Sequence, residues 1–65
     1  MKQWKVFVNG RCIENGILVY HIAVVKADTK EEAKQIAIRE FLSLDNGAYE
    51  LLKRHPVQYT REIKQ

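Results

Sequence analysis

The motif T-K-E-E at residues 29–32, directly after an apolar run that ends at Ala27, constrains the fold of this chain more than any other feature. It matches the S/T-x-x-E capping box. In that motif the threonine hydroxyl accepts a hydrogen bond from the glutamate amide, and the glutamate carboxylate accepts one from the threonine amide. Together with Asp28, the motif also places negative charge beside the free N–H groups of a first helical turn. We therefore predict a sharp corner between residues 24 and 41, where a strand ends and a helix begins.

The segment after this motif carries apolar residues at helical spacing. They recur at i, i+3 and i+4, which gives one apolar stripe on a helix. The stripe consists of Ala33, Ile36, Ala37, Phe41 and Leu44, with Ile38 and Leu42 on its flank and Lys30, Lys34 and Arg39 on the opposite side. The pattern predicts an amphipathic helix that packs on a sheet, where the two alanines allow a close approach.

Length and composition predict one small domain that covers residues 1–65. A chain of this size buries only about 60% of its unfolded surface, so a dimer or a partner would add stability. A hydrophobic content of 46% favours a folded protein, and the net charge of +3 permits an acidic partner. The lone cysteine, Cys12, excludes an intrachain disulfide. With no signal peptide or membrane span in the pattern, we expect a cytoplasmic location, in a host cytoplasm if a phage encodes the protein.

Two strands are expected before the helix. Lys2 to Val8 alternates between apolar and polar residues, an alternation broken only by Phe7. Ile17 to Ala27 is the longest apolar run and is rich in β-branched and aromatic residues. Between them lie Asn9-Gly10 and Asn15-Gly16, either of which is suited to a type I′ turn.

The remainder of the chain predicts a helix end, a short second helix and a last strand. Asp45-Asn46-Gly47 is a suitable helix stop, and Ala48 to His55 has the residues for a possible short helix before Pro56. Val57 to Lys64 then alternates as a strand. Its apolar side is expected to carry Val57, Tyr59, Arg61 and Ile63, and its polar side Gln58, Thr60, Glu62 and Lys64. The expected fold is α+β, with the order ββαβ, a three-stranded antiparallel sheet of order 2-1-3 and one main helix on one face.

The second strand carries more apolar surface than a single helix can cover. If Ala27 faces the helix, alternation turns Leu18, Tyr20, Ile22 and Val24 away from it. The sequence does not settle which face the helix covers, but either choice leaves exposed apolar side chains. This strand also lies at the sheet edge, where its free backbone groups can pair with another strand. The pattern therefore favours a partner protein or a homodimer joined through this edge.

No motif for catalysis, metal binding or cofactor binding is present. The soft metal ligands His21, His55 and Cys12 lack the paired spacing of a zinc site, and the single serine, Ser43, has no suggested base. Neither Asn-Gly pair forms a glycine-rich phosphate loop. We therefore expect a protein that is not an enzyme and that holds no cofactor or metal.

Basic residues near the first and last strands support an alternative. Lys5, Lys53, Arg54 and Arg61, with Tyr59 among them, form a possible strip for phosphate contact and base stacking. Interspersed glutamates and the small net charge favour an ordinary solvated face instead. Arg61 is the exception, because it lies on the apolar side of its strand. It belongs either to the rim of the core or to a contact with a partner.

The run A-D-T-K-E-E-A at residues 27–33 with Ala37, an apolar strand before it and Thr60-Arg61 in the last strand, resembles the small bacteriophage inhibitors of host RNA polymerase of the T7 type. The resemblance implies a ββαβ fold of about this length and a role for Arg61 in contacting the polymerase. A second arginine of that family is replaced here by Ile63, and residues 42–55 are longer than the family's connection. More broadly, it is similar to small non-enzymatic phage proteins, including anti-CRISPR and other anti-defence inhibitors.

We therefore expect a small phage or mobile-element inhibitor that blocks a host protein by direct binding. The contacts expected for the partner are Tyr20, Ile22, Val24, Tyr59 and Arg61, because aromatic and arginine side chains dominate many interfaces. A nucleic-acid-binding module that uses the basic strip is the alternative.

Overall fold

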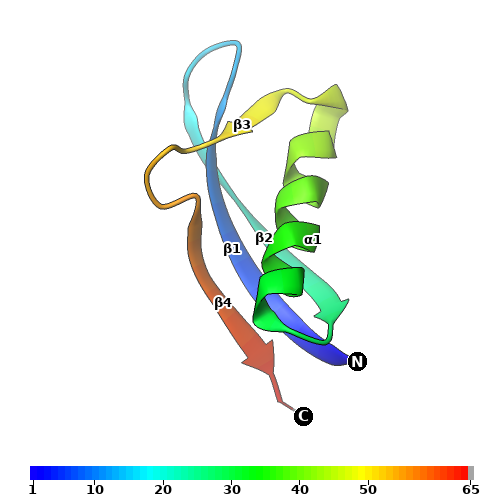
Figure 1. The fold of residues 1–65 in the computed structure, drawn as a ribbon. Helices are drawn as coiled ribbons and strands as arrows, with labels where there is room; N and C mark the ends of the chain where they lie inside the picture. Colours follow the sequence, from blue (N-terminus) through cyan, green and yellow to red (C-terminus); the bar gives the residue numbers. More distant parts are fainter. Residues whose placement is uncertain (65) are drawn as a thin grey trace.

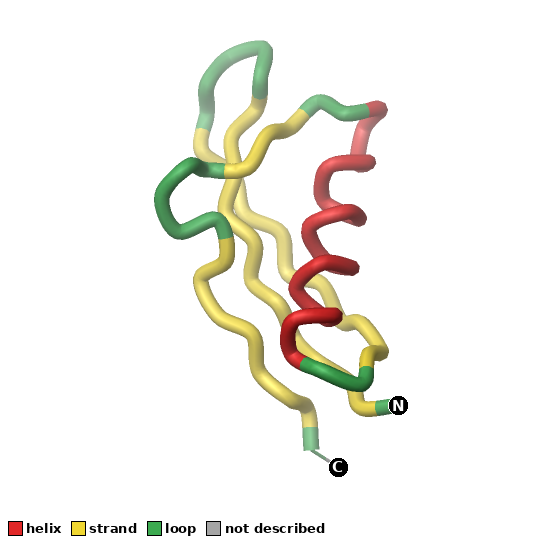
Figure 2. Tube along the Cα trace, in the orientation of Figure 1, coloured by secondary structure: helices red, strands yellow, loops and turns green. Residues whose placement is uncertain are grey.

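A computed structural model describes residues 1–64 as one antiparallel sheet with a helix across one of its faces (Figure 1). In chain order the elements are β1 (Lys2–Cys12), β2 (Leu18–Ala27), α1 (Lys30–Ser43), the 3₁₀ turn η1 (Leu44–Asn46), β3 (Tyr49–Leu51) and β4 (Val57–Ile63). Figure 2 shows the two layers, with the helix in front of the strands and the chain ends together at one end of the sheet. The α+β class is confirmed. None of the helices in this part of the chain has the length and apolar character of a membrane-spanning segment.

The strand β1 lies at the centre of the sheet and pairs with all the others. β2 flanks it on one side with Trp4 opposite Val25 and Val8 opposite His21. β3 and β4 share its other side, with β3 at Gly10–Cys12 and β4 at residues 3–8. The predicted placing of the last strand beside the first, opposite the second, is therefore confirmed, but the sheet has four strands and not three.

The predicted short helix over Ala48 to His55 is wrong, because the chain forms β3 there. β1 is longer than β4 and leaves its end from Gly10 to Cys12 open on that side, where residues 49–51 pair with it. Tyr49 also stacks on Phe41, with 5.6 Å between the ring centroids. The apolar spacing of this segment fits either a helix or a strand, and the free edge of β1 with the ring of Phe41 selects the strand.

Only the second Asn-Gly pair is a turn. Gly16 has a φ of 72°, and its N–H donates to the Cys12 carbonyl at 2.8 Å in the hairpin loop. Asn9, in contrast, lies inside β1 and anchors the connection between β3 and β4. Its N–H donates to the Pro56 carbonyl at 2.9 Å, and its carbonyl accepts from the Leu52 N–H at 3.2 Å. Its side-chain amide donates to the His55 carbonyl at 3.1 Å.

The helix begins where the capping motif predicts. Thr29 is the N-cap residue, and its hydroxyl accepts from the Glu32 N–H at 3.2 Å. Gly47, with a φ of 81°, follows the helical segment as expected for a stop. Ala33, Ala37 and Phe41 are buried, so the helix lies close to the sheet over β2 and β1. The buried core consists of Trp4, Val6, Val8, Ala23, Val25, Ala27, Ala33, Ala37 and Phe41.

The helix covers the face of β2 that carries Ala23, Val25 and Ala27, as expected if Ala27 turns inward. The predicted faces of the last strand are partly wrong. Val57 packs against the core, whereas Tyr59 pairs with Phe7 on the other side. Opposite Phe7 and Val8, a β-bulge leaves Gln58 of β4 as an extra residue and switches the alternation of that strand. As a result, Thr60 from the predicted polar side is buried beneath the helix.

Candidate docking surface

The side of the sheet away from α1 is here called the open face. Register and alternation from the buried residues define it, because neighbours across paired strands point to the same side. It is formed by Gln3, Lys5, Phe7 and Asn9 of β1, Leu18, Tyr20, Ile22, Val24 and Lys26 of β2, and Tyr59, Arg61 and Ile63 of β4. No element of the described chain lies across this face (Figure 2).

Large apolar side chains on β2 are exposed on the open face. Leu18 is 70% exposed, Tyr20 66%, Val24 61% and Ile22 40%. The intervening residues Ala23 and Val25 are 3% and 8% exposed. Contiguous apolar surface of this kind is uncommon on monomeric proteins and marks sites of association. The strand is therefore apolar on both sides, and the chain covers only one of them.

An aromatic row crosses the open face from β2 to β4. Tyr20 and Phe7 are stacked with 5.0 Å between ring centroids and an interplanar angle of 21°. Phe7 and Tyr59 follow at 5.5 Å and 52°, and the Arg61 guanidinium lies over the Tyr59 ring at 4.5 Å. These contacts fix the side chains against one another, so the row is a preformed surface.

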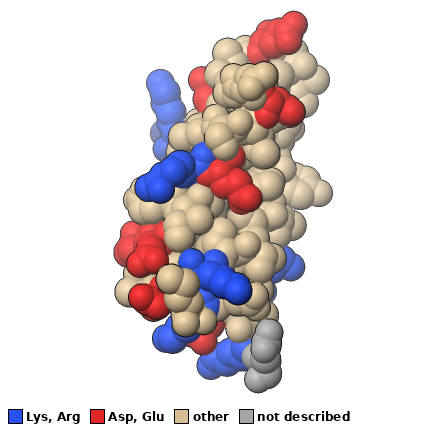
Figure 3. Space-filling view, turned by 90° about the vertical axis from the view of Figure 1, so that its right-hand side faces the viewer, with Lys and Arg blue, Asp and Glu red and all other residues tan. Residues whose placement is uncertain are grey.

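Three cations lie on the open face toward one end of the sheet, namely Lys5 and Arg61 beside the aromatic row and Lys26 beyond Val24, and they are here called the cation triad. All three are exposed. Lys5 and Arg61 are directly opposite in the β1–β4 register. Within residues 1–64 the ion pairs of lysine and arginine involve other residues: Lys2 with Glu62, Arg11 with Glu50, and Lys34 with Glu31. On the helix side, in contrast, Figure 3 shows positive and negative side chains intermingled.

The structure brings the predicted partner contacts onto one surface. Tyr20, Ile22 and Val24 lie in a row on β2, and Tyr59 and Arg61 lie on the same face of β4. The predicted partner contacts did not include Phe7 or Lys26, which lie on the same face. The signal for Phe7 was a large aromatic residue at a polar position of the strand alternation.

The residues of the predicted basic strip are divided. Lys5, Tyr59 and Arg61 come together on the open face. Lys53 and Arg54 are exposed in the connection between β3 and β4, which Asn9 anchors. Asn9 lies four positions along β1 from Lys5, a distance of roughly 13 Å along the strand. The strip is therefore two separate groups of cations.

The outer edge of β2 borders the open face. Among the described residues β2 pairs only with β1, over the register from Leu18 to Ala27. The strand is ten residues long and has no proline, so its outer backbone groups are available for a further strand. The face and the edge form one continuous surface.

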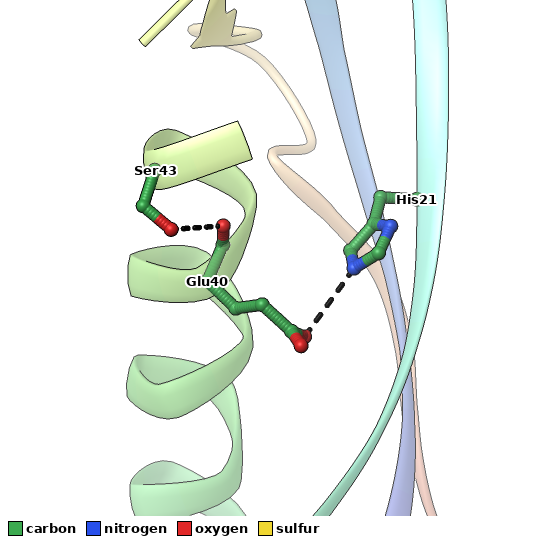
Figure 4. A network of polar contacts seen from close by, with 3 residues as sticks. All are labelled: His21, Glu40 and Ser43. Carbon is green, nitrogen blue, oxygen red and sulfur yellow. Dashed lines mark hydrogen bonds and ion pairs between the residues drawn. The ribbon is translucent and has the colours of Figure 1, made fainter. Parts of the chain in front are cut away.

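The polar residues considered for chemistry lie elsewhere, and the side chains of His21 and Ser43 have structural partners. His21 is on the helix side, with Nε2 3.3 Å from Glu40 Oε2 (Figure 4). The Ser43 hydroxyl donates to the backbone carbonyl of Glu40 at 2.8 Å, which bends it back onto its own helix. Cys12 is half-buried at the end of β1. Within residues 1–64, no three side chains of His, Cys, Asp or Glu gather as a metal site would require.

No protein-family model matches this chain, and comparisons with curated proteins and with solved structures found no match.

Proposed function

We propose that this chain is a small non-enzymatic binding protein that places its open face and the adjoining edge of β2 against a partner protein. The observation that carries the proposal is the exposed row Leu18, Tyr20, Ile22 and Val24, which the chain leaves uncovered. Covering such a row removes apolar surface from water, which is the main driving force of protein association. A partner protein supplies the cover that the single helix cannot.

The chemistry of the face suits a protein interface. Aromatic and arginine side chains carry much of the binding energy in many interfaces. Tyr20, Tyr59 and Arg61 are held in place by the contacts of the aromatic row, so little side-chain entropy is lost when a partner binds. Tyr20, Ile22, Val24, Tyr59 and Arg61 are the proposed contacts.

The partner in this proposal is a host protein, and binding blocks its activity. The resemblance to phage inhibitors of RNA polymerase supports this form of the proposal, because Arg61 is exposed on the face proposed for docking. A defence protein of the host is an equally suitable target. Both are inhibited by occupation of a surface and require no catalytic group from this chain.

Capture from bacterial lysate with matched variants tests the proposal. The variant Y20A/R61A removes an aromatic and an arginine from the open face. The control I13A/R39A removes an exposed apolar residue and an arginine from elsewhere. The proposal expects a specific partner that the wild type and the control retain and that Y20A/R61A loses. Retention of every specific partner by Y20A/R61A refutes it.

A nucleic-acid-binding module remains the second candidate, because Lys5 and Arg61 lie beside Tyr59 on an exposed sheet. Single-stranded nucleic acids stack their bases on open aromatic faces. Here, however, Phe7 lies between Tyr20 and Tyr59, and the Arg61 guanidinium covers Tyr59. The stacked rings favour an apolar protein surface over bases. A gel shift at low salt that is lost at physiological salt would support the second candidate, and no shift at low salt would refute it.

A further inference from the structure

We infer that the partner surface is apolar at its centre and carries carboxylates that meet the cation triad Lys5, Lys26 and Arg61. This inference rests on the proposed function and specifies the chemistry of the partner. Its basis is the positive charge of the open face, which a partner with acidic side chains would complement.

The cations of the triad repel one another, and an anion from outside the chain would reduce this repulsion. Like charges directly opposite on paired strands repel and are destabilising. Lys5 and Arg61 are such a pair. Lys26 lies on β2, two residues after Val24, which is the residue opposite Lys5. No ion pair to any of the three exists within residues 1–64, although Arg61 contacts the Tyr59 ring.

The acidic residues nearest the open face in the described chain are paired with other cations. Glu50 is the acid whose register puts it on the same side of the sheet, opposite Arg11, and it forms an ion pair with Arg11 at 3.2 Å. Glu62 points to the other side of β4 and lies 3.8 Å from Lys2. The positive charge of the open face is therefore uncompensated by the described chain.

A shallow hollow continues the cationic end of the open face. It has a volume of about 590 Å³ and lies where the two ends of the chain meet. Its walls are formed by Met1, Gln3, Lys26, Glu62, Ile63 and Lys64. The wall carries two lysines, Lys26 and Lys64, and one acid, Glu62, which lies 3.8 Å from Lys2. Positive charge is therefore in excess around the hollow, and an acidic side chain of the partner would lie beside two lysines.

The same charges argue against a second copy as the occupant of this face. Two open faces packed together would bring six triad cations into one interface, because each copy contributes Lys5, Lys26 and Arg61. The acid that each copy has on this side, Glu50, already forms an ion pair with Arg11. Like charges facing each other across an interface suppress association. The face therefore selects a different protein, one with acidic residues around an apolar patch.

Selection from a random twelve-residue peptide display library tests the inference on the immobilised full chain. The triad variant is K5Q/K26Q/R61Q. The control variant K30Q/K34Q/R39Q makes the same change in net charge on the helix side. We expect the wild type to enrich peptides that combine aspartate or glutamate with apolar residues. We expect these peptides to bind the triad variant roughly tenfold more weakly and the control within about twofold of wild type, with weaker binding at higher salt.

The outcomes separate this inference from the proposed function. Selected peptides that lose binding to Y20A but are neutral or basic, or that bind the triad variant as tightly as wild type, overturn the inference and leave the docking face intact. Peptides insensitive to Y20A, or no selected peptide, overturn both. If the wild type binds a ten-nucleotide oligo-dT more tightly than any selected peptide, the triad is a phosphate-binding site and the inference is overturned. If the triad variant dimerises more strongly than the wild type, the face belongs to a second copy of the chain, and the inference is overturned.

Discussion

The ring of Phe41 packs directly on the backbone of Gly10. A Cβ added to Gly10 would meet both this ring and the backbone carbonyl oxygen of Glu50. The glycine therefore lets the helix and β3 approach β1 at the same point. We predict that G10A lowers the free energy of unfolding by about 1–3 kcal/mol, as overpacking of a core does. Denaturation followed by the fluorescence of Trp4, which is 8% exposed, measures it.

A double-mutant cycle with F41L identifies the contact responsible. If the ring of Phe41 is the obstacle, the loss in G10A/F41L is smaller than the sum of the two single losses. An unchanged denaturation midpoint in G10A would contradict this packing.

The hydroxyl of Thr29 caps α1. T29A leaves the Glu32 N–H without this acceptor and is expected to lower stability by about 1 kcal/mol. T29S retains the hydroxyl and should stay close to wild type in the same denaturation experiment. Equal losses in the two variants would mean that the methyl group, and not the cap, stabilises the corner.

Removal of the Thr60 hydroxyl, in contrast to that of Thr29, should raise stability. It is 9% exposed, and its Oγ1 has no hydrogen-bond partner among the described residues. A buried hydroxyl without a partner is destabilising, so T60V, which keeps the shape of the side chain, should raise stability by about 1 kcal/mol. T60S keeps the hydroxyl and loses the methyl, and it should lower stability. A T60V protein less stable than wild type would show that the hydroxyl does bond in solution.

The hydroxyl of Tyr49 donates to Asp45 Oδ2 at 2.9 Å. This hydrogen bond, and then the charge of the carboxylate, raise the pKa of Tyr49 above its ordinary value of 10.0. Because the folded state holds the proton more tightly, the stability from this pair is present below pH 10 and is lost as the pH rises through the raised pKa.

Ultraviolet absorbance titration measures the raised pKa of Tyr49, and Y49F is the reference that assigns the Tyr49 transition. D45N removes the carboxylate charge and should bring the pKa of Tyr49 down. Asn suits the positive φ of 48° at position 45. A Tyr49 transition that D45N leaves in place would contradict the assignment.

Sequence patterns predicted the parts of the fold that depend on neighbouring residues. The capping motif located the start of α1. Alternation separated the two sides of β2, and the buried Ala23, Val25 and Ala27 of the structure decide which side faces the helix, a choice that the sequence had left open. The parts that depend on distant contacts were not predictable. Tyr49 and Leu51 fit a helix or a strand equally, and the free end of β1 decided between them. Packing of Phe41 on Gly10 has no local signature.

The candidate surface was predictable to a similar extent. Strict alternation on β2 brought Tyr20, Ile22 and Val24 together, as the structure confirms. On β4, the bulge opposite Phe7 and Val8 left Val57 on the core side, as predicted, but placed Tyr59 on the open face and Thr60 beneath the helix. An inserted residue of this kind reverses the facing of a strand and leaves its composition unchanged. Tyr59 and Arg61 nevertheless remained on one face, where they meet Phe7.

Site-specific photocrosslinking tests the central claim, that the open face contacts a partner protein, most directly. A photoreactive phenylalanine analogue replaces Tyr20 on the open face, or Gln35 on the exposed side of α1 as the matched control, and both proteins are irradiated in bacterial lysate. The account predicts a discrete protein adduct from position 20 and none from position 35. Adducts from position 35 with none from position 20 would contradict it.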